Sequence, residues 1–392
     1  MAERKPAESM SAAAPIEPGR HETALAAIDA SIGRLGDKND PGSARELARA
    51  LMSRAIVAAR LGRGAEEMAS CDDLIRRFTM SGDADVVAMV AMAHNRRGRA
   101  LVVADRLNDA LTAFDLAWAI STGWKEPALV RQAAAALYAT GTLRKRLGQT
   151  GEAISAWNDM VVQYADCDDI EVAQKMVAAD QARAGLLRAS ERGNEAARVY
   201  AQLMDRVARR PEPAFVKAYG DAALMRADCL IASEYHKGAV ECCEDAIAFL
   251  TTAGEQDLAA PLRAELGLVR ARALRALGRS DDAAAGLAEI DRLFRDSRDA
   301  ALSEKVAQAL VELAELKAAG SDFEKAGKIC DLVVRRYAAS GNEDLQQLVQ
   351  RAQSLAARAT AGIGPVDGAL GALNDLELDH APSDDDMALE PA

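Results

Sequence analysis

The stretch "GQTGEAISAWNDMVVQY" (residues 148–164) opens with a glycine and runs through an amphipathic segment to a tyrosine. A second stretch, "GRSDDAAAGLAEIDRLF" (residues 278–294), has the same layout with few of the same residues. In both, an alanine follows the glycine by five positions, at Ala153 and Ala283. One layout written in two different sets of residues indicates that a structural unit repeats along the chain.

The alanine marks a period that covers most of the chain. Seven intervals of 43 residues and one of 44 connect nine positions, which we call the anchors. Only Glu67 among them is not alanine. The anchors are Ala24, Glu67, Ala110, Ala153, Ala196, Ala239, Ala283, Ala326 and Ala369.

Positions around the anchors repeat as well. Glycine lies five residues before five of them, at Gly19, Gly62, Gly148, Gly278 and Gly364. Twelve residues before an anchor the side chain is always small, at Ala55, Gly98, Gly141, Ala184, Ala227, Ala271, Ala314 and Ala357. Four residues after it comes a larger or softer residue, which we call the follower: Ile28, Cys71, Phe114, Trp157, Tyr200, Cys243, Leu287, Cys330 and Leu373. Because residues four apart share a helix face, each unit is predicted to be two closely packed antiparallel helices of about 15–17 residues.

Composition agrees with an all-α protein. Half of the 392 residues are apolar but only 4 % are aromatic, so the apolar half is rich in alanine and leucine, which form helices readily. Pro127, Pro211, Pro213 and Pro261 lie at or near the joints between units, where a proline can begin a helix. A single hairpin cannot bury its apolar face, so the units are expected to stack into an α-solenoid.

The pattern resembles the tetratricopeptide repeat family, in a longer bacterial-type variant with a period of about 43 residues. The best matches are Gly141, Gly148, Ala153 and Trp157 in one unit, and Gly98, Ala110, Phe114 and Ala117 in another. HEAT-like or armadillo-like repeats fit the period too, but the glycine-to-alanine spacing argues against them. The resemblance implies a right-handed superhelix whose first helices line a concave groove for a peptide or partner segment.

Carried onto this sequence, the groove candidates lie on the first helices and face away from the anchors. They are Arg49, Arg60, Asn95, Arg99, Tyr138, Lys145, Arg146, Gln181, Arg188, Arg272, Arg275 and Arg358. Several of the basic ones lie seven or eight residues before an anchor. Such a series either binds acidic partner segments through bidentate arginine contacts or covers apolar surface with solvated heads. Asp228, Glu265 and Glu315 on the same predicted side leave both interpretations open.

No motif for catalysis, metal or cofactor binding is found. The four histidines are dispersed, and neither GxSxG, GxxxxGK[ST] nor GxGxxG after a strand occurs. Cys229, His236, Cys242 and Cys243 lie close in sequence, but Cys243 is a follower and no CxxC spacing is present, so buried thiols are the better interpretation. We therefore predict a protein that is not an enzyme and uses no cofactor or metal.

Three segments are expected: a disordered 1–20, a repeat array of eight to nine units over 21–376, and an acidic disordered tail over 377–392. The net charge of −12 argues against nucleic-acid binding. From Leu376 onward the tail has six acidic residues and no basic one; it is either solvated or folds back into the basic groove. Six scattered cysteines, no signal-peptide core and no long apolar run point to the cytoplasm, without a membrane partner.

The predicted function is a bacterial, cytoplasmic scaffold or adaptor that binds protein or peptide segments, acidic ones among them, in its concave groove. The alternative is a sensor or regulatory subunit that controls a separate effector enzyme in signalling or defence. Partner, pathway and oligomeric state are not encoded in any recognisable motif.

Overall fold

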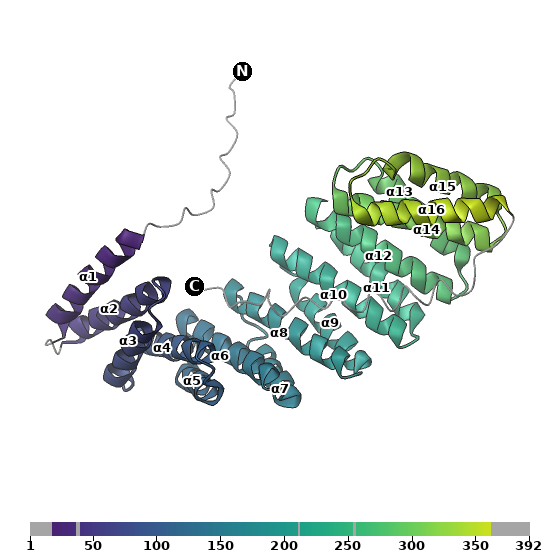
Figure 1. Ribbon diagram of the computed structural model, residues 1–392. Coiled ribbons are helices and arrows are strands. Elements are labelled where there is room, and N and C mark those ends of the chain that lie inside the picture. Colours follow the sequence, from purple (N-terminus) through teal and green to yellow (C-terminus); the bar gives the residue numbers. More distant parts are fainter. Residues whose placement is uncertain (1–17, 37–39, 211, 254–255, 362–392) are drawn as a thin grey trace, which may run out of the picture. The chain divides into compact units, whose positions relative to one another are not determined.

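The computed structural model describes residues 18–36, 40–210, 212–253 and 256–361 (Figure 1). In these ranges it has sixteen α-helices and no β-strand, which confirms the all-α prediction. The predicted N-terminal segment up to residue 17 and everything predicted beyond residue 361, including Gly364, Ala369 and Leu373, lie outside the described residues. Helix α1 begins at Pro18, within the segment 1–20 that was expected to be disordered.

Helices alternate between two kinds. The odd-numbered helices carry all eight described anchors: α1 (Pro18–Leu35), α3 (Gly64–Phe78), α5 (Leu107–Ser121), α7 (Thr150–Gln163), α9 (Gly193–Val207), α11 (His236–Thr252), α13 (Ser280–Phe294) and α15 (Phe323–Tyr337). The even-numbered helices precede them in each hairpin: α2 (Pro41–Arg60), α4 (Ala84–Val103), α6 (Pro127–Arg146), α8 (Ile170–Ala189), α10 (Pro213–Ala232), α12 (Gln256–Ala276), α14 (Ala300–Ala319) and α16 (Glu343–Thr360). The even-numbered helices, of 18 to 21 residues, are longer than the 15–17 expected.

The chain forms two compact units, Met1–Leu186 and Leu187–Ala392, divided within α8. In the first unit, α2 contacts α4 and α4 contacts α6. In the second, α10 contacts α12, α12 contacts α14 and α14 contacts α16. The odd-numbered helices pack against the even-numbered ones that flank them in the sequence. Each unit is therefore a stack of hairpins whose even-numbered helices adjoin one another, and we call this set of helices the even-helix layer.

The repeated small and large residues meet in the core. Anchors Ala110 and Ala153 are fully buried, and every described follower from Cys71 to Cys330 is at most 4 % exposed. A Cβ atom at Gly98 would lie 2.5 Å from the Phe114 ring, and one at Gly141 would lie 2.4 Å from Nε1 of Trp157. Both distances are far inside van der Waals contact. Glycine is thus required in these two hairpins because an aromatic follower rests on the helix backbone.

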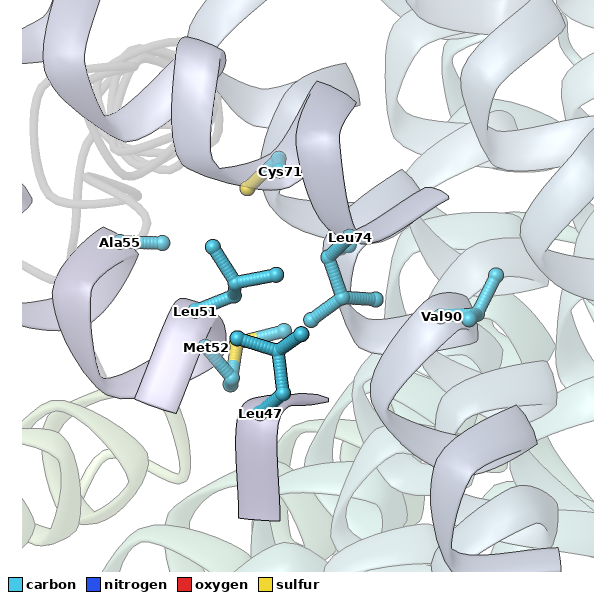
Figure 2. Packing of buried hydrophobic residues seen from close by; sticks show 8 residues of the cluster. Leu47, Leu51, Met52, Ala55, Cys71, Leu74 and Val90 are labelled. Atoms are coloured by element: carbon cyan, nitrogen blue, oxygen red, sulfur yellow. The ribbon is translucent and has the colours of Figure 1, made fainter. Parts of the chain in front are cut away.

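Figure 2 shows the core of the first hairpin, where Leu47, Leu51, Met52 and Ala55 of α2 face Cys71 and Leu74 of α3 and Val90 of α4. The follower here is a cysteine, and the opposing small residue is alanine. A smaller follower leaves room for the alanine methyl group. Burial of this cluster from three consecutive helices joins one hairpin to the next.

Glu67, the one anchor that is not alanine, has a specific partner. Its carboxylate lies 2.8 Å from Nη2 of Arg96 on α4, and both side chains are largely buried. An ion pair therefore takes the place of the alanine packing seen in the other hairpins. A residue of the next hairpin thus compensates for the missing alanine.

The hairpin turns share one backbone conformation. The residue five before the anchor has a positive φ in all seven hairpins, at Gly62 (72°), Asp105 (56°), Gly148 (72°), Glu191 (60°), Glu234 (59°), Gly278 (74°) and Ser321 (63°). In each turn the amide of the following residue donates to the carbonyl five residues before it, as Gln149 does to Arg144 at 2.9 Å. This is the Schellman ending of an α-helix, which favours glycine. Four hairpins adopt it without glycine.

The starts of the even-numbered helices also repeat. Asp40, Asp83, Asp299 and Asn342 each accept backbone N–H groups at a helix N-terminus, and Asp169 does so ahead of α8. Arg45 binds Asp83, and Arg131 binds Asp169 at 2.7 Å, so an arginine near the start of one even-numbered helix holds the cap of the next. The Arg45 hydrogen bond holds the pKa of Asp83 below its usual range.

Two of the four prolines confirm the prediction about joints: Pro127 and Pro213 are the first residues of α6 and α10. Pro211 lies outside the described residues. For Pro261 the prediction is wrong, because it lies inside α12, which begins at Gln256. Proline lacks an N–H, so one hydrogen bond of the second helical turn is missing there.

Introducing glycine into the hairpin turns that lack it is expected to stabilise the protein. Glu191→Gly and Glu234→Gly should each raise the free energy of unfolding by about 1 kcal/mol, because a left-handed residue with a Cβ is strained. Chemical denaturation of each variant measures the change. Gly148→Ala is the matched control and should lower it by a similar amount, since no neighbour lies within 4 Å of the added Cβ and only the backbone conformation is affected. Unchanged stability in the glutamate variants would contradict the assignment of strain.

Candidate partner-binding surface

Charge is sorted between the two kinds of helix in the first unit. Helices α2, α4 and α6 carry eleven Lys and Arg residues and only two Asp and Glu residues. Helices α3, α5 and α7 carry eight acidic residues and two basic ones. Although the whole chain has a net charge of −12, the even-helix layer of this unit is strongly basic.

The second unit is different. Its even-numbered helices α10, α12, α14 and α16 carry ten basic and nine acidic residues. Arg351 on α16 lies 2.7 Å from Glu315 on α14, and Lys305 lies 3.8 Å from Glu265. The basic series predicted from Arg60 to Arg275 is therefore uneven, and its net positive charge is concentrated in the first unit.

The predicted residues of the second unit lie among acidic groups. Arg272 and Arg275 are half-buried on α12, near the buried Glu312 of α14. Burial raises the pKa of Glu312, and both arginines act against that shift. Arg188 places Nη1 2.9 Å from Sδ of Met225, and Arg358 is half-buried on α16. Two of these cations thus lie near an acidic residue, and Arg188 contacts a thioether.

Several predicted residues of the first unit also have structural contacts. Asn95 is 2 % exposed, and its Nδ2 donates to the backbone and side-chain oxygens of Gln132, both at 3.0 Å, which joins α4 to α6. Arg146 lies 3.0 Å from Asp105, and Arg49 lies 3.8 Å from Asp85. Arg60 is exposed at the end of α2, whereas Lys145 and Gln181 are half-buried.

Arg99 on α4 and Lys175 on α8 form the most distinctive pair in this layer. Both are half-buried, and no described carboxylate lies within 4.0 Å of the cationic nitrogens of either. Burial lowers the pKa of Lys175, and the neighbouring Arg99 charge lowers it further. Burial likewise lowers the pKa of Arg99, with Arg96 adding to the effect. Both cations are thus partly desolvated, and neither has an acidic partner within ion-pair distance among the described residues.

Tyr138 lies on α6. Among the even-numbered helices, α6 comes between α4, which carries Arg99, and α8, which carries Lys175. The backbone carbonyl of Tyr138 accepts hydrogen bonds from Nε1 of Trp157 at 3.2 Å and from Oγ1 of Thr142 at 2.9 Å. The Tyr138 side chain is half-buried, and this burial raises the pKa of its hydroxyl. The aromatic follower of this hairpin therefore holds the backbone beneath the candidate surface.

Sequence reasoning identified Arg99 and Tyr138 but missed Lys175. The basic candidates lie 7 to 18 residues before an anchor, whereas Lys175 lies 21 residues before Ala196, nearer the start of its helix. It could have been found by following one helix face, since Lys175, Ala178 and Ala182 lie at helical spacing on α8.

Cys229, Cys242 and Cys243 are buried, as predicted, and of the six cysteines only Cys167 is half-buried. Cys243 has no exposed surface and fills the follower position of α11. Burial raises the pKa of Cys71 to about 12, and burial also raises the pKa of Cys243. No three of the described His, Cys, Asp and Glu side chains are grouped so that they could hold a metal ion. None of the helices in the described ranges has both the length and the apolar character needed to cross a membrane.

Comparison with known proteins gives similarity of fold. No protein-family model matches the chain, and no curated protein matches it. A tetratricopeptide repeat protein from Parabacteroides merdae is 13 % identical over 78 % of this chain and 98 % of its own, with a TM-score of 0.34. Apo RapI is 10 % identical over 88 % and 100 %, with a TM-score of 0.45. A Rap protein in complex with Competence and Sporulation Factor is 14 % identical over 85 % and 94 %, with a TM-score of 0.34. The neighbours are of the tetratricopeptide-repeat type, as the sequence resemblance indicates, and at these identities the likeness does not extend to a partner.

Acid should destabilise the first unit through His94. Burial, with a smaller contribution from Arg97, lowers the pKa of His94 to about 4, while Asp72 acts in the opposite direction. Because the unfolded state binds the proton more tightly, stability is full above pH of about 6.5 and falls as the pH drops towards 4, by up to about 3 kcal/mol. Denaturation as a function of pH measures this loss.

His94→Leu removes the titrating group and serves as the comparison. Its stability should depend less on pH between about 6.5 and 4 than that of the unsubstituted protein. Parallel pH profiles for the two proteins would show that His94 is not the group responsible.

Proposed function

We propose that this protein is a non-enzymatic interaction module, a scaffold or adaptor, whose even-helix layer in the first unit binds an acidic segment of a protein partner. The observation that carries the proposal is the sorting of charge: eleven basic against two acidic residues on α2, α4 and α6. Charge separation within a net acidic protein attracts anionic partners to one set of helices and repels them from the other.

Arg99 and Lys175 supply the strongest local reason for a partner. Each has been moved partly out of water without gaining an acidic neighbour within ion-pair distance. An anionic group bound to either of them would offset the cost of desolvating that cation. In the second unit, by contrast, Arg272 and Arg275 act on Glu312, and Arg351 is paired with Glu315.

The surroundings of the pair favour a segment over an isolated side chain. Arg60 is exposed on α2 and Tyr138 is half-buried on α6, so cationic and aromatic groups extend along the layer. An extended segment with several carboxylates can contact more than one of them. Each ionic contact is then weak, and the total binding free energy depends on the salt concentration.

Binding of a labelled glutamate-rich peptide to the full-length protein tests the proposal. Fluorescence anisotropy should show binding at low ionic strength that weakens as salt screens the charges. The double variant Arg99→Glu/Lys175→Glu should weaken binding by about tenfold or more, because both attractions become repulsions. Lys217→Glu on α10, whose Nζ lies 2.7 Å from Asp221, is the matched control and should bind like the unsubstituted protein.

A lysine-rich peptide of the same length should not bind. Equal binding of the glutamate-rich peptide to the double variant and to the control would refute the location of the surface. If the protein is a regulatory subunit, the same surface is used, and co-purified partners would include an enzyme whose activity changes when it is released.

A further inference from the structure

The two outermost described helices are of different kinds. Within the described ranges, α1 is odd-numbered and has no even-numbered helix before it, and α16 is even-numbered and has no odd-numbered helix after it. An inner odd-numbered helix such as α3 contacts the even-numbered helices on both sides, α2 and α4. In the described part of the chain, each outermost helix therefore lacks a neighbour that the repeat supplies elsewhere.

Helix α16 exposes a position that the other even-numbered helices bury. The small residue twelve before the anchor is buried in all seven described hairpins, from Ala55 to Ala314. Its counterpart in α16, Ala357, is exposed. The exposed residues on this side of α16 are Gln347, Gln350, Gln353, Ser354, Ala357 and Thr360. None of them is charged, although 28 % of the chain is, and a lack of charge is typical of the centre of a protein interface.

Helix α1 exposes the opposite half of the same contact. Its anchor Ala24 and its follower Ile28 are half-buried, whereas the other described alanine anchors are fully buried and the other described followers are at most 4 % exposed. Ala27, three residues after the anchor, is exposed, whereas its counterpart Ala113 in α5 is fully buried. The open face of α1 is thus made of small and apolar residues.

The hairpins show how an odd-numbered helix fits on such a face. The position twelve before the anchor lies against the follower, as Gly141 does against Trp157. The position sixteen before the anchor lies against the residue seven after it, since a Cβ atom on Gly267 would be 2.9 Å from Cδ1 of Ile290. On α16 these two positions are Ala357 and the exposed Gln353.

Two segments have a sequence that matches this register. The chain's own residues 365–376 would place Leu376 opposite Gln353, whereas α1 of a second copy would place Ser31 there. A glutamine amide buried against leucine loses its hydrogen bonds, but a serine hydroxyl supplies a partner for it. The second copy also covers the open face of α1, which residues 365–376 leave uncovered. Both arguments favour the second copy.

We propose that the protein associates head to tail, with α1 of one copy packed on α16 of another. Ile28 of the second copy then occupies the follower position over Ala357. Because two different faces are joined, the contact does not close on itself and the copies form an open series. Each copy adds one more basic layer, so a partner with several acidic segments gains avidity. The association itself does not depend on acidic-segment binding.

The even-numbered helices would also meet across this contact. Within the first unit, the residue 22 positions before an anchor binds the cap of the next even-numbered helix, as Arg131 binds Asp169 at 2.7 Å. In α16 this residue is the exposed Gln347, and the next cap is the exposed Asp40 of the second copy. The repeat thus predicts that Gln347 and Asp40 lie side by side.

One pair of like charges limits the strength of the contact. Glu315 and Arg351 bind each other at 2.7 Å, and they lie eleven and eighteen residues before their anchors. The same register places Arg358 opposite Arg49 of the second copy. Their repulsion makes the association weak and reversible, and salt should strengthen it by screening them.

Sedimentation velocity of the full-length protein tests the proposal. The average mass should rise with protein concentration and pass that of a dimer. Ala357→Glu on α16 and Ala27→Glu on α1 each place a charge in one of the two faces, and each should weaken association by tenfold or more. Ala119→Glu, at an exposed alanine of α5, is the matched control and should associate like the unsubstituted protein. Thermal unfolding first establishes that each variant is folded.

An equimolar mixture of Ala27→Glu and Ala357→Glu distinguishes head-to-tail association from other kinds. Each variant keeps the face that the other has lost, so the mixture should form dimers and nothing larger. A mixture that stays monomeric would overturn the proposal, as would association that neither substitution weakens. A symmetric dimer, in which one variant alone still pairs, would overturn it too.

A substitution that strengthens the contact tests its register. Gln347→Arg should tighten association about two- to fivefold, because it recreates the arginine–cap pair with Asp40 of the second copy. In an Asp40→Ser background, where serine still caps α2, the gain should be lost. An equal gain in both backgrounds would contradict the register.

The remaining outcomes identify other occupants and separate this inference from the proposed function. If the full-length protein stays monomeric and removal of residues 362–392 makes it associate, the chain's own residues cover α16 and the second copy is wrong. If neither form associates, the proposal is also wrong. In both cases binding of the glutamate-rich peptide to the first unit is unaffected, and the Ala357→Glu variant should bind it like the unsubstituted protein.

Discussion

In the α4–α5 and α6–α7 hairpins, the close approach of an aromatic follower to a glycine sets how the two helices pack. Trp157 rests on Gly141 and Phe114 rests on Gly98, at distances that leave no room for a Cβ atom. A ring against bare backbone fixes both the separation and the rotation of the two helices in a hairpin. Trp157 adds a hydrogen bond to the carbonyl of Tyr138, so the core contact also holds the helix that carries part of the candidate surface. Hairpins with cysteine or leucine followers use alanine, as does the hairpin whose follower is Tyr200 and whose small residue is Ala184, so the repeat accommodates several sizes of paired side chains.

Periodic features of the fold could be predicted from the sequence, because packing imposes them at every unit. The burial of the anchors and followers and the left-handed turn at Gly148 follow from that period. Features that occur once could not be predicted. Glu67 interrupts the anchors because its partner Arg96 lies 29 positions away on another helix, and Pro261 is tolerated within α12 despite its missing N–H. The candidate surface was predicted in part for the same reason: residues on first helices can be named from the period, whereas which of them are half-buried without an acidic partner, as Arg99 and Lys175 are, depends on contacts between helices.

Function then depends on how the fold distributes charge. Packing constrains the anchor and follower positions but leaves the outward positions free to vary, and in the first unit those on the even-numbered helices became basic. In the second unit the same positions alternate in sign and neutralise each other, as Glu315 and Arg351 do. Two units built on one repeat thus differ in the charge carried by their even-numbered helices.

A double-mutant cycle on Gly141 and Trp157 tests this account at its centre. Gly141→Ala should lower the free energy of unfolding by about 1–3 kcal/mol when Trp157 is present, because the added methyl group displaces the ring. In a Trp157→Leu background the same substitution should be neutral or stabilising by up to about 1 kcal/mol, as alanine favours the helix. If Gly141→Ala has the same effect in both backgrounds, the glycine and the ring are not coupled, and the packing rule proposed for the repeat is wrong.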